Sequence, residues 1–223
     1  MLKTACLIFK MEIVLLFRRS QEWLYPLSFF MMVILFFPLA FTSDAHFLQT
    51  YVPGFVWIAA LLASLLSVET LFLPEIEDGH LEQLLISPLP LSLLLLAKLL
   101  AQWLVTQIPI IILLPVIGWL FHLSFQSVGL LMISLLIGTP ILTMLGGLCV
   151  ALTLGLRQQG VFLGLLMMPL AIPILIFGVT IVQQAQVGFA IKGALAFLAG
   201  ITAFTIFVLP AVIATGLRIS LDD

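Results

Sequence analysis

Charge is scarce in this sequence. Only 8 lysines and arginines and 10 aspartates and glutamates occur in 223 residues, so charged residues make up 8% of the chain. Soluble domains carry about 25% charged residues, and the shortage excludes a soluble domain of useful size. The basic residues form no stripe, so a nucleic-acid partner is not expected.

Cysteine and histidine are also rare. Cys6 and Cys149 have no CxxC spacing, and we interpret them as small apolar side chains without a structural disulfide. His46, His80 and His122 lie far apart in the chain, in predicted loops or at span boundaries. We interpret them as solvated loop residues rather than metal or haem ligands, so no metal site is predicted.

The common motifs of catalysis and nucleotide binding are missing. The sequence contains no GxxxxGK[ST], HExxH or GxSxG pattern and no cluster of cysteine and histidine. These absences predict that the chain is not an enzyme and has no catalytic or cofactor-binding residues. Any energy from ATP would have to come through a separate subunit.

Apolar residues are abundant. They make up 63% of the chain, compared with about 45–50% in soluble domains. They come in runs of about 20 residues or more, which predicts an all-α integral membrane protein forming one transmembrane domain over residues 1–223. Six spans are expected, at about residues 23–41, 53–72, 98–121, 127–155, 161–182 and 193–216.

Residues 1–22 mix basic and apolar side chains. Lys10 and Glu12 interrupt the apolar region that a signal peptide would need. We predict an interfacial helix on the cytoplasmic face of the membrane, with its basic side toward water. The alternative is a loosely ordered terminus.

The second predicted span carries small side chains at four-residue spacing. Ala59, Ala63 and Ser67 form one row, and Ala60 and Ser64 form an adjacent one. Such rows predict a close approach of a neighbouring helix.

Two charged residues are predicted to mark span boundaries. Glu69 is expected to reach the inner surface, with a buried functional carboxylate as the alternative. Lys98 is expected to begin the third span, with its ammonium group at the cytoplasmic headgroups. Residues 43–51 are expected to form a short polar loop before the second span.

The distribution of lysine and arginine predicts the orientation of the chain. With the N-terminus inside, the outer segments 43–52, 122–126 and 183–192 contain one basic residue, Lys192. The positive-inside rule then places both termini in the cytoplasm. The inner basic residues are Lys3, Lys10, Arg18, Arg19, Lys98, Arg157 and Arg218.

Residues 74–90 are the one long polar interruption between two apolar blocks. Within them, Leu81, Leu84 and Leu85 are spaced to share one helical face, and Pro88 ends the helix. A helix this short is not stable alone, so its exposed leucines predict a partner with a groove. Acidic residues surround these leucines at Glu75, Glu77, Asp78 and Glu82.

This segment resembles a known element. Residues 77–88 are similar to the coupling segment of ABC-2-type transporter permeases, whose E-x-G-T/S-L-E-Q-L-L-x-x-P pattern joins spans two and three. His80 departs from it, since the wider family usually has Thr or Ser there. Further runs resemble the CcmB family of haem exporter permeases in bacterial cytochrome c maturation, over nearly the whole chain. These runs are residues 53–66, 78–85, 88–90, 97–98, 138–140 and 217–220.

The resemblance implies a set of partners in the bacterial inner membrane. The chain would pair with a second copy of itself and bind two copies of a cytosolic ATPase subunit. A haem-handling membrane subunit and a small accessory membrane peptide would complete the complex, surrounded by membrane lipid. The residues implied to contact the ATPase are Glu77, Asp78, Gly79, Leu81, Glu82, Leu84 and Leu85.

The implied function is to couple ATP hydrolysis to release of a haem-loaded chaperone for c-type cytochrome biogenesis. The tryptophan-rich motif with aspartate that marks the haem-handling subunits is absent here. We therefore expect the chain to transmit force and bind no cofactor itself, while other subunits of the complex handle haem and ATP. Alternatives are an ABC-2-type permease exporting a drug, lipid or polysaccharide, a membrane enzyme, and a non-transporting membrane scaffold.

Overall fold

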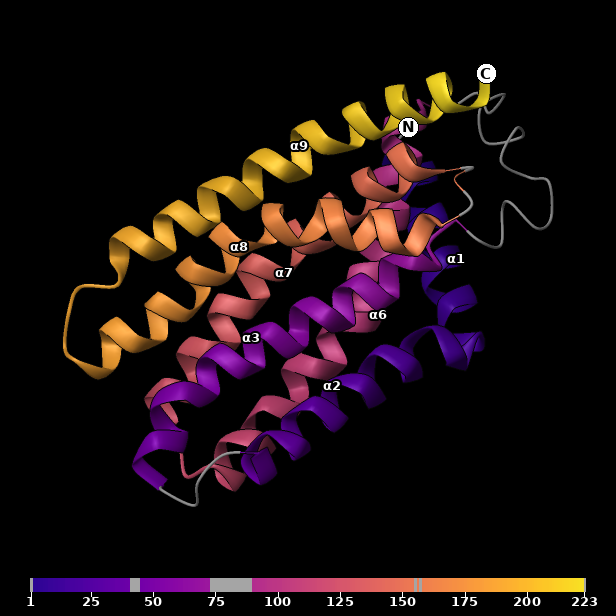
Figure 1. Cartoon of the computed structure of the whole chain (residues 1–223). Helices are drawn as coiled ribbons and strands as arrows, with labels where there is room; N and C mark the ends of the chain where they lie inside the picture. Colours follow the sequence, from indigo (N-terminus) through magenta and orange to yellow (C-terminus); the bar gives the residue numbers. More distant parts are fainter. Residues whose placement is uncertain (1, 41–44, 73–89, 155, 157, 223) are drawn as a thin grey trace.

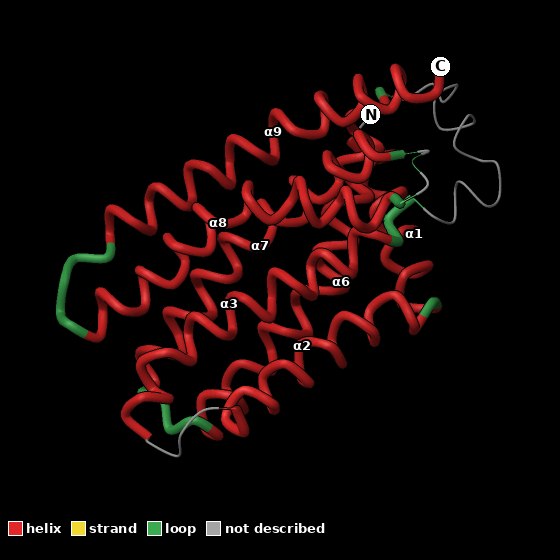
Figure 2. The backbone as a smooth tube through the Cα atoms, in the orientation of Figure 1, coloured by secondary structure: helices red, strands yellow, loops and turns green. Residues whose placement is uncertain are grey.

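A computed structural model describes residues 2–40, 45–72, 90–154, 156 and 158–222. Every regular element in those ranges is an α-helix, as Figure 2 shows, which confirms the all-α prediction. The helices are α1 (Leu2–Arg18), α2 (Ser20–Ala40), α3 (Ala45–Glu69), α6 (Leu91–Leu120), α7 (Phe125–Thr153), α8 (Gln159–Gln186) and α9 (Lys192–Asp222).

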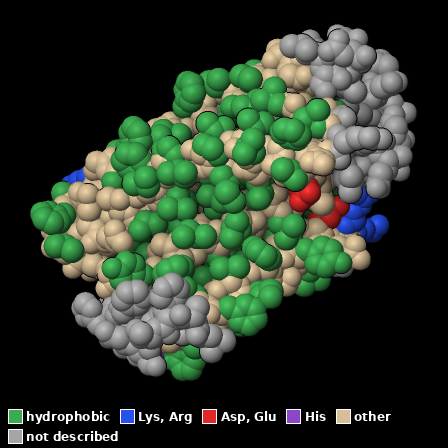
Figure 3. All heavy atoms as spheres, in the orientation of Figure 1, with side chains coloured by type: hydrophobic (Ala, Val, Ile, Leu, Met, Phe, Trp, Pro, Cys, Tyr) green, Lys and Arg blue, Asp and Glu red, His purple; other side chains and the backbone are tan. Residues whose placement is uncertain are grey.

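Five of the described helices are long and apolar enough to cross a membrane: α3, α6, α7, α8 and α9. Helices α1 and α2 meet at a bend of 65° and pass the same criterion only as a pair. Apolar side chains cover the visible side of the molecule, while charged side chains gather at its ends (Figure 3). The chain is therefore a multi-pass membrane protein.

Helices α2 to α9 run back and forth as an antiparallel bundle, so both chain ends lie at the same end of it (Figure 1). We call this the Lys98 end, because Lys98 lies in the first turns of α6 there. Helix α7 contacts α3, α6, α8 and α9. Helix α1 contacts α6 more extensively than it contacts α2. The core of the bundle therefore forms around α7.

Tight packing surrounds Trp57 of α3. Its side chain is 0% exposed and lies against Gly138 of α7 and Gly178 of α8, where a Cβ atom would overlap the indole ring. Likewise, Gly146 of α7 makes room for Val68. The predicted rows of small residues on α3 are buried, which confirms a close approach of neighbouring helices. Their members Ala59, Ala60, Ala63, Ser64 and Ser67 are all 2% exposed or less.

The helices extend beyond several predicted spans. The loop prediction for residues 43–51 is wrong from Ala45 onward, because α3 begins there and contains Pro53. Helix α6 begins at Leu91, and α8 continues to Gln186 into the predicted outer segment. Hydropathy marks where apolar side chains end, whereas backbone hydrogen bonding continues a helix into the interface.

Candidate functional site

The predicted partner-binding segment is framed by α3 and α6. Leu71 and Phe72 follow α3, and Pro90 precedes α6 as its N-cap residue. The predicted contact residues themselves lie outside the described residues: Glu77, Asp78, Gly79, Leu81, Glu82, Leu84 and Leu85. The described part of the site is therefore the frame that holds the two ends of this segment.

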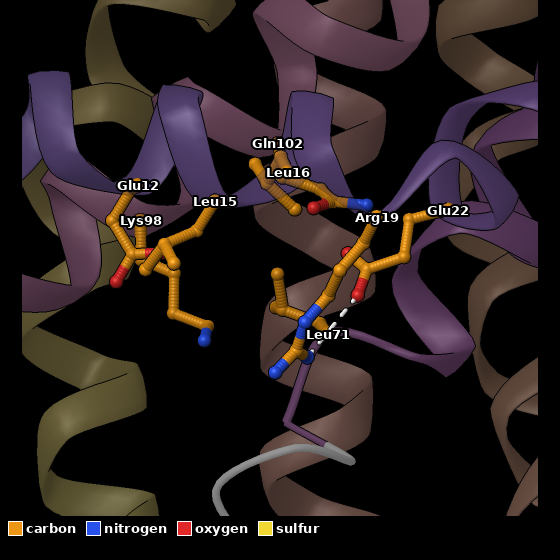
Figure 4. Close-up of a pocket in the computed structure, with 8 residues that line it drawn as sticks. All are labelled: Glu12, Leu15, Leu16, Arg19, Glu22, Leu71, Lys98 and Gln102. Atoms are coloured by element: carbon orange, nitrogen blue, oxygen red, sulfur yellow. Dashed lines mark hydrogen bonds and ion pairs between the residues drawn. The ribbon is translucent and has the colours of Figure 1, made fainter.

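A small pocket with charged walls lies at this frame, between α1, α2, α3 and α6 (Figure 4). Its volume is about 80 Å³. Arg19 Nη1 lies 3.4 Å from Glu22 Oε1 on one side, and Glu12 and Lys98 lie on the other. The formal charges of these two acidic and two basic residues sum to zero. Leu15, Leu16, Leu71 and Gln102 complete the lining.

Lys98 of α6 contacts a residue near the end of α3. Its Nζ atom lies 5.7 Å from the centroid of the Phe72 ring, within the range of a cation–π contact. The side chain is half-buried in the pocket wall. This contact joins the eighth residue of α6 to Phe72, three residues after the end of α3, a role that the headgroup interpretation of Lys98 did not include.

A set of buried polar side chains ties α3 to α6 within the bundle. Gln102 Nε2 donates to Ser67 Oγ at 2.7 Å and to Ser67 O at 3.1 Å, and Gln107 Nε2 donates to Ser64 Oγ at 2.7 Å. All four residues are 2% exposed or less. We call Ser64, Ser67, Gln102 and Gln107 the polar ladder. Each such bond between membrane helices contributes on average about 0.6 kcal/mol.

Two tryptophans bond the same two helices, α3 and α6, to α7. Trp57 Nε1 donates to Ser134 Oγ at 3.2 Å, and Trp103 Nε1 donates to Thr139 Oγ1 at 2.9 Å. Each of these indole N–H groups thus has a hydrogen-bond partner on α7. Helices α3 and α6 are thus both bonded to the central helix.

Glu69 lies at the Lys98 end and is exposed, which agrees with its predicted position at the surface rather than with the buried alternative. Its carboxylate lies over Gly160 in the first turn of α8, where a Cβ atom would overlap Oε1. A carboxylate is favourable at a helix N-terminus because the backbone N–H groups there carry partial positive charge.

Sequence reasoning missed the polar ladder. No motif marks these residues, because uncharged amides inside apolar spans follow no fixed sequence pattern. The available signal was the occurrence of Gln102 and Gln107 inside an apolar block together with Ser64 and Ser67 in the span before it. Which amide meets which hydroxyl depends on helix rotation, which a single sequence does not specify.

Comparison with known proteins agrees with the resemblance seen in the sequence. A model of the family described as "CcmB protein" matches residues 3–220. The chain is 45% identical to "Heme exporter protein B" of Pseudomonas aeruginosa over 97% of both chains. It is 43% identical to the protein of that name from Haemophilus influenzae, over 97% of this chain and 98% of that one.

The Escherichia coli K12 protein with the same name is 42% identical, over 96% of this chain and 98% of its own. The matches therefore include the transmembrane helices together with the segment between α3 and α6. From this coverage and this identity, the chain belongs to the CcmB family.

Proposed function

We propose that this chain is the permease subunit of an ABC transporter for haem delivery in c-type cytochrome biogenesis, located in the bacterial inner membrane. The observation that carries the proposal is the near full-length similarity to relatives named "Heme exporter protein B". The fold supports it, because long apolar helices frame a polar segment at one end of the bundle.

In this proposal the chain has no nucleotide site of its own and works with a separate ATPase subunit in two copies. The ATPase binds residues 74–90, mainly through Leu81, Leu84 and Leu85, in the manner of a helix in a groove. Its motion moves α3 and α6, and the dimer of this chain passes the force to a haem-handling membrane subunit and a small accessory peptide. The haem-loaded chaperone is then released.

The proposed topology has six spans, with α2 as the first, α1 on the cytoplasmic surface, and both termini in the cytoplasm. The antiparallel bundle supports it, because Arg18, Arg19 and Lys98 lie at the Lys98 end, whereas Lys192 begins α9 at the opposite end. In a background without Cys6 and Cys149, a membrane-impermeant thiol reagent should label Phe125→Cys in intact cells. Phe125 suits this purpose because it is 95% exposed at the opposite end.

Gln83→Cys is the matched inner position. It should react with the reagent only after the membrane has been permeabilised. Labelling of Gln83→Cys from outside intact cells would reverse the proposed orientation.

Force transmission without haem binding predicts that the histidines are dispensable. A strain lacking this chain should make no c-type cytochrome, and the wild-type chain should restore it. The triple variant His46→Ala, His80→Ala, His122→Asn should restore cytochrome to within about twofold of wild type, because haem iron would have no histidine ligand here to lose. Asn replaces His122 because its φ of 53° lies in the left-handed region that Asn tolerates.

The measurement is covalent haem staining of periplasmic cytochromes, normalised to the amount of variant in the membrane. Among the described residues no three side chains of His, Cys, Asp or Glu come together as a metal site. Loss of cytochromes with a stably inserted His46→Ala or His122→Asn variant would indicate direct haem handling. Normal cytochromes in the deletion strain would overturn the proposed function.

A further inference from the structure

Helices α3 and α6 are joined twice at the Lys98 end. The chain joins them through residues 73–89, and the polar ladder joins them inside the bundle. Gln102 belongs to the ladder, since it donates two hydrogen bonds to Ser67, and it also lines the charged pocket beside the segment. A displacement applied to the segment therefore meets a hydrogen-bonded pair of helices.

The ladder fixes the two helices at two levels. Gln102 and Gln107 are five residues apart on α6, which is about 7.5 Å along the helix axis. Their acceptors Ser67 and Ser64 are three residues apart on α3. A bond at one level would leave α6 free to slide or rotate about it, whereas bonds at two levels oppose both movements.

A contribution to fold stability alone does not explain why Gln102 and Gln107 lie inside the bundle. Gln107 is 0% exposed, and its Oε1 atom has no hydrogen-bond partner among the described residues. A buried polar atom without a partner destabilises the fold, and polar side chains inside a membrane are costly and tend to be functional. Since interhelical hydrogen bonds in membranes add little stability, leucine would serve a purely structural helix contact as well.

The two helices that the ladder joins are each also hydrogen-bonded to α7. Trp57 of α3 bonds Ser134 of α7, and Trp103 of α6 bonds Thr139 of α7. Helix α7 in turn contacts α8 and α9. If α3 and α6 could slide past each other, a displacement of residues 73–89 would be lost as movement between these two helices. Held together, they pass it to α7.

We propose that Gln102 and Gln107 are positioning residues, which make α3 and α6 move as one unit and so couple ATP hydrolysis to haem delivery. The inference rests on the proposed function and deepens it. These residues contact neither the ATPase nor haem. They act through the rigidity of the helix pair that holds the ATPase-binding segment.

The test is the double variant Gln102→Leu, Gln107→Leu in the full complex. Leucine favours membrane insertion, so the variant should reach the membrane and retain the ATPase subunit. ATP hydrolysis by the purified complex should remain within about twofold of wild type, while covalent haem on c-type cytochromes falls about tenfold. Hydrolysis would then be separated from delivery.

A matched control is Gln186→Leu. Gln186 Nε2 also donates to a serine hydroxyl, Ser127 Oγ at 3.3 Å, but it joins α8 to α7 at the opposite end of the bundle. It should leave both readouts unchanged. Wild-type cytochrome levels in the double variant would overturn the inference. The inference would also be overturned if ATP hydrolysis and cytochrome levels both fell in proportion to the amount of complex, because that pattern indicates a purely structural role.

Two smaller substitutions test the inference if the double variant does not accumulate in the membrane. Ser64→Ala removes the hydroxyl that accepts from Gln107, whereas Ser67→Ala leaves Gln102 the backbone oxygen of residue 67. The inference expects a larger loss of cytochromes from Ser64→Ala, and Ser64→Thr should restore them by returning a hydroxyl. Wild-type cytochrome levels in both alanine variants would overturn the inference. If the inference about Gln102 and Gln107 fails but the deletion strain still makes no c-type cytochrome, the proposed function stands.

Discussion

Leu84→Asp is expected to abolish co-purification of the ATPase subunit and, with it, cytochrome assembly. Leu81, Leu84 and Leu85 are spaced to share one face of a short helix, which would bury them in a groove of the partner. Burying one leucine contributes about 1.5–3 kcal/mol, so its loss alone weakens binding about 10- to 150-fold. Aspartate adds the cost of a charge against an apolar wall.

The matched control is Gln83→Asp, which places the same charge one residue away. Position 83 falls on the opposite side of the helical wheel from the three leucines, so its side chain should remain in water. This variant should bind the ATPase within about twofold of wild type. Equal binding by Leu84→Asp and wild type, measured by affinity purification from membranes, would show that the leucine face is not the contact.

Trp57→Ala is expected to cause the largest loss of fold stability. The indole is fully buried between α7 and α8 and donates to Ser134 Oγ. Removing a large buried aromatic side chain costs about 3–5 kcal/mol, because the surrounding helices close only part of the cavity. Gly178→Ala should destabilise by about 1–3 kcal/mol through overpacking against the same ring. Thermal unfolding of the purified protein in detergent measures both.

Gly164→Ala is the control on the same helix. The nearest atom to a Cβ there is Leu65 Cδ2 at 4.0 Å, so an added methyl group has room. Alanine is also the better helix former. Its unfolding temperature should equal or exceed that of wild type. A loss at Gly164→Ala as large as at Gly178→Ala would mean that the helix, rather than the contact with Trp57, responds.

The membrane makes the coarse fold readable from the sequence. A bilayer core admits long apolar helices, so the runs in the sequence predict where α3 to α9 lie, and the small residues of α3 predict its packed face. Helix ends are less predictable, as α3 illustrates. It begins at Ala45 and carries Pro53 internally, because polar residues can continue a helix beyond the apolar region.

The site is predictable to a lesser degree. The spacing of Leu81, Leu84 and Leu85 predicts an exposed apolar face, and this stays a prediction because it lies outside the described residues. Lys98 was predicted at a span boundary, but its contact with Phe72 depends on how two helices approach each other. The pairing of Gln102 with Ser67 joins residues 35 positions apart, and it depends on how α3 and α6 are rotated relative to each other.

The docking of α1 on α6 has a consequence for synthesis of the protein. Leu16 of α1 forms a small cluster with Ala101 and Val105 of α6, which follow it by about 85 residues in the chain. A ribosome adds about 5–20 residues per second, so α1 leaves it about 4–17 s before its partner helix exists. During that interval the apolar side of α1 has no protein to cover it. The contact between α1 and α6 therefore forms late in synthesis, and the position of α1 in the fold is fixed only after α6 has been made.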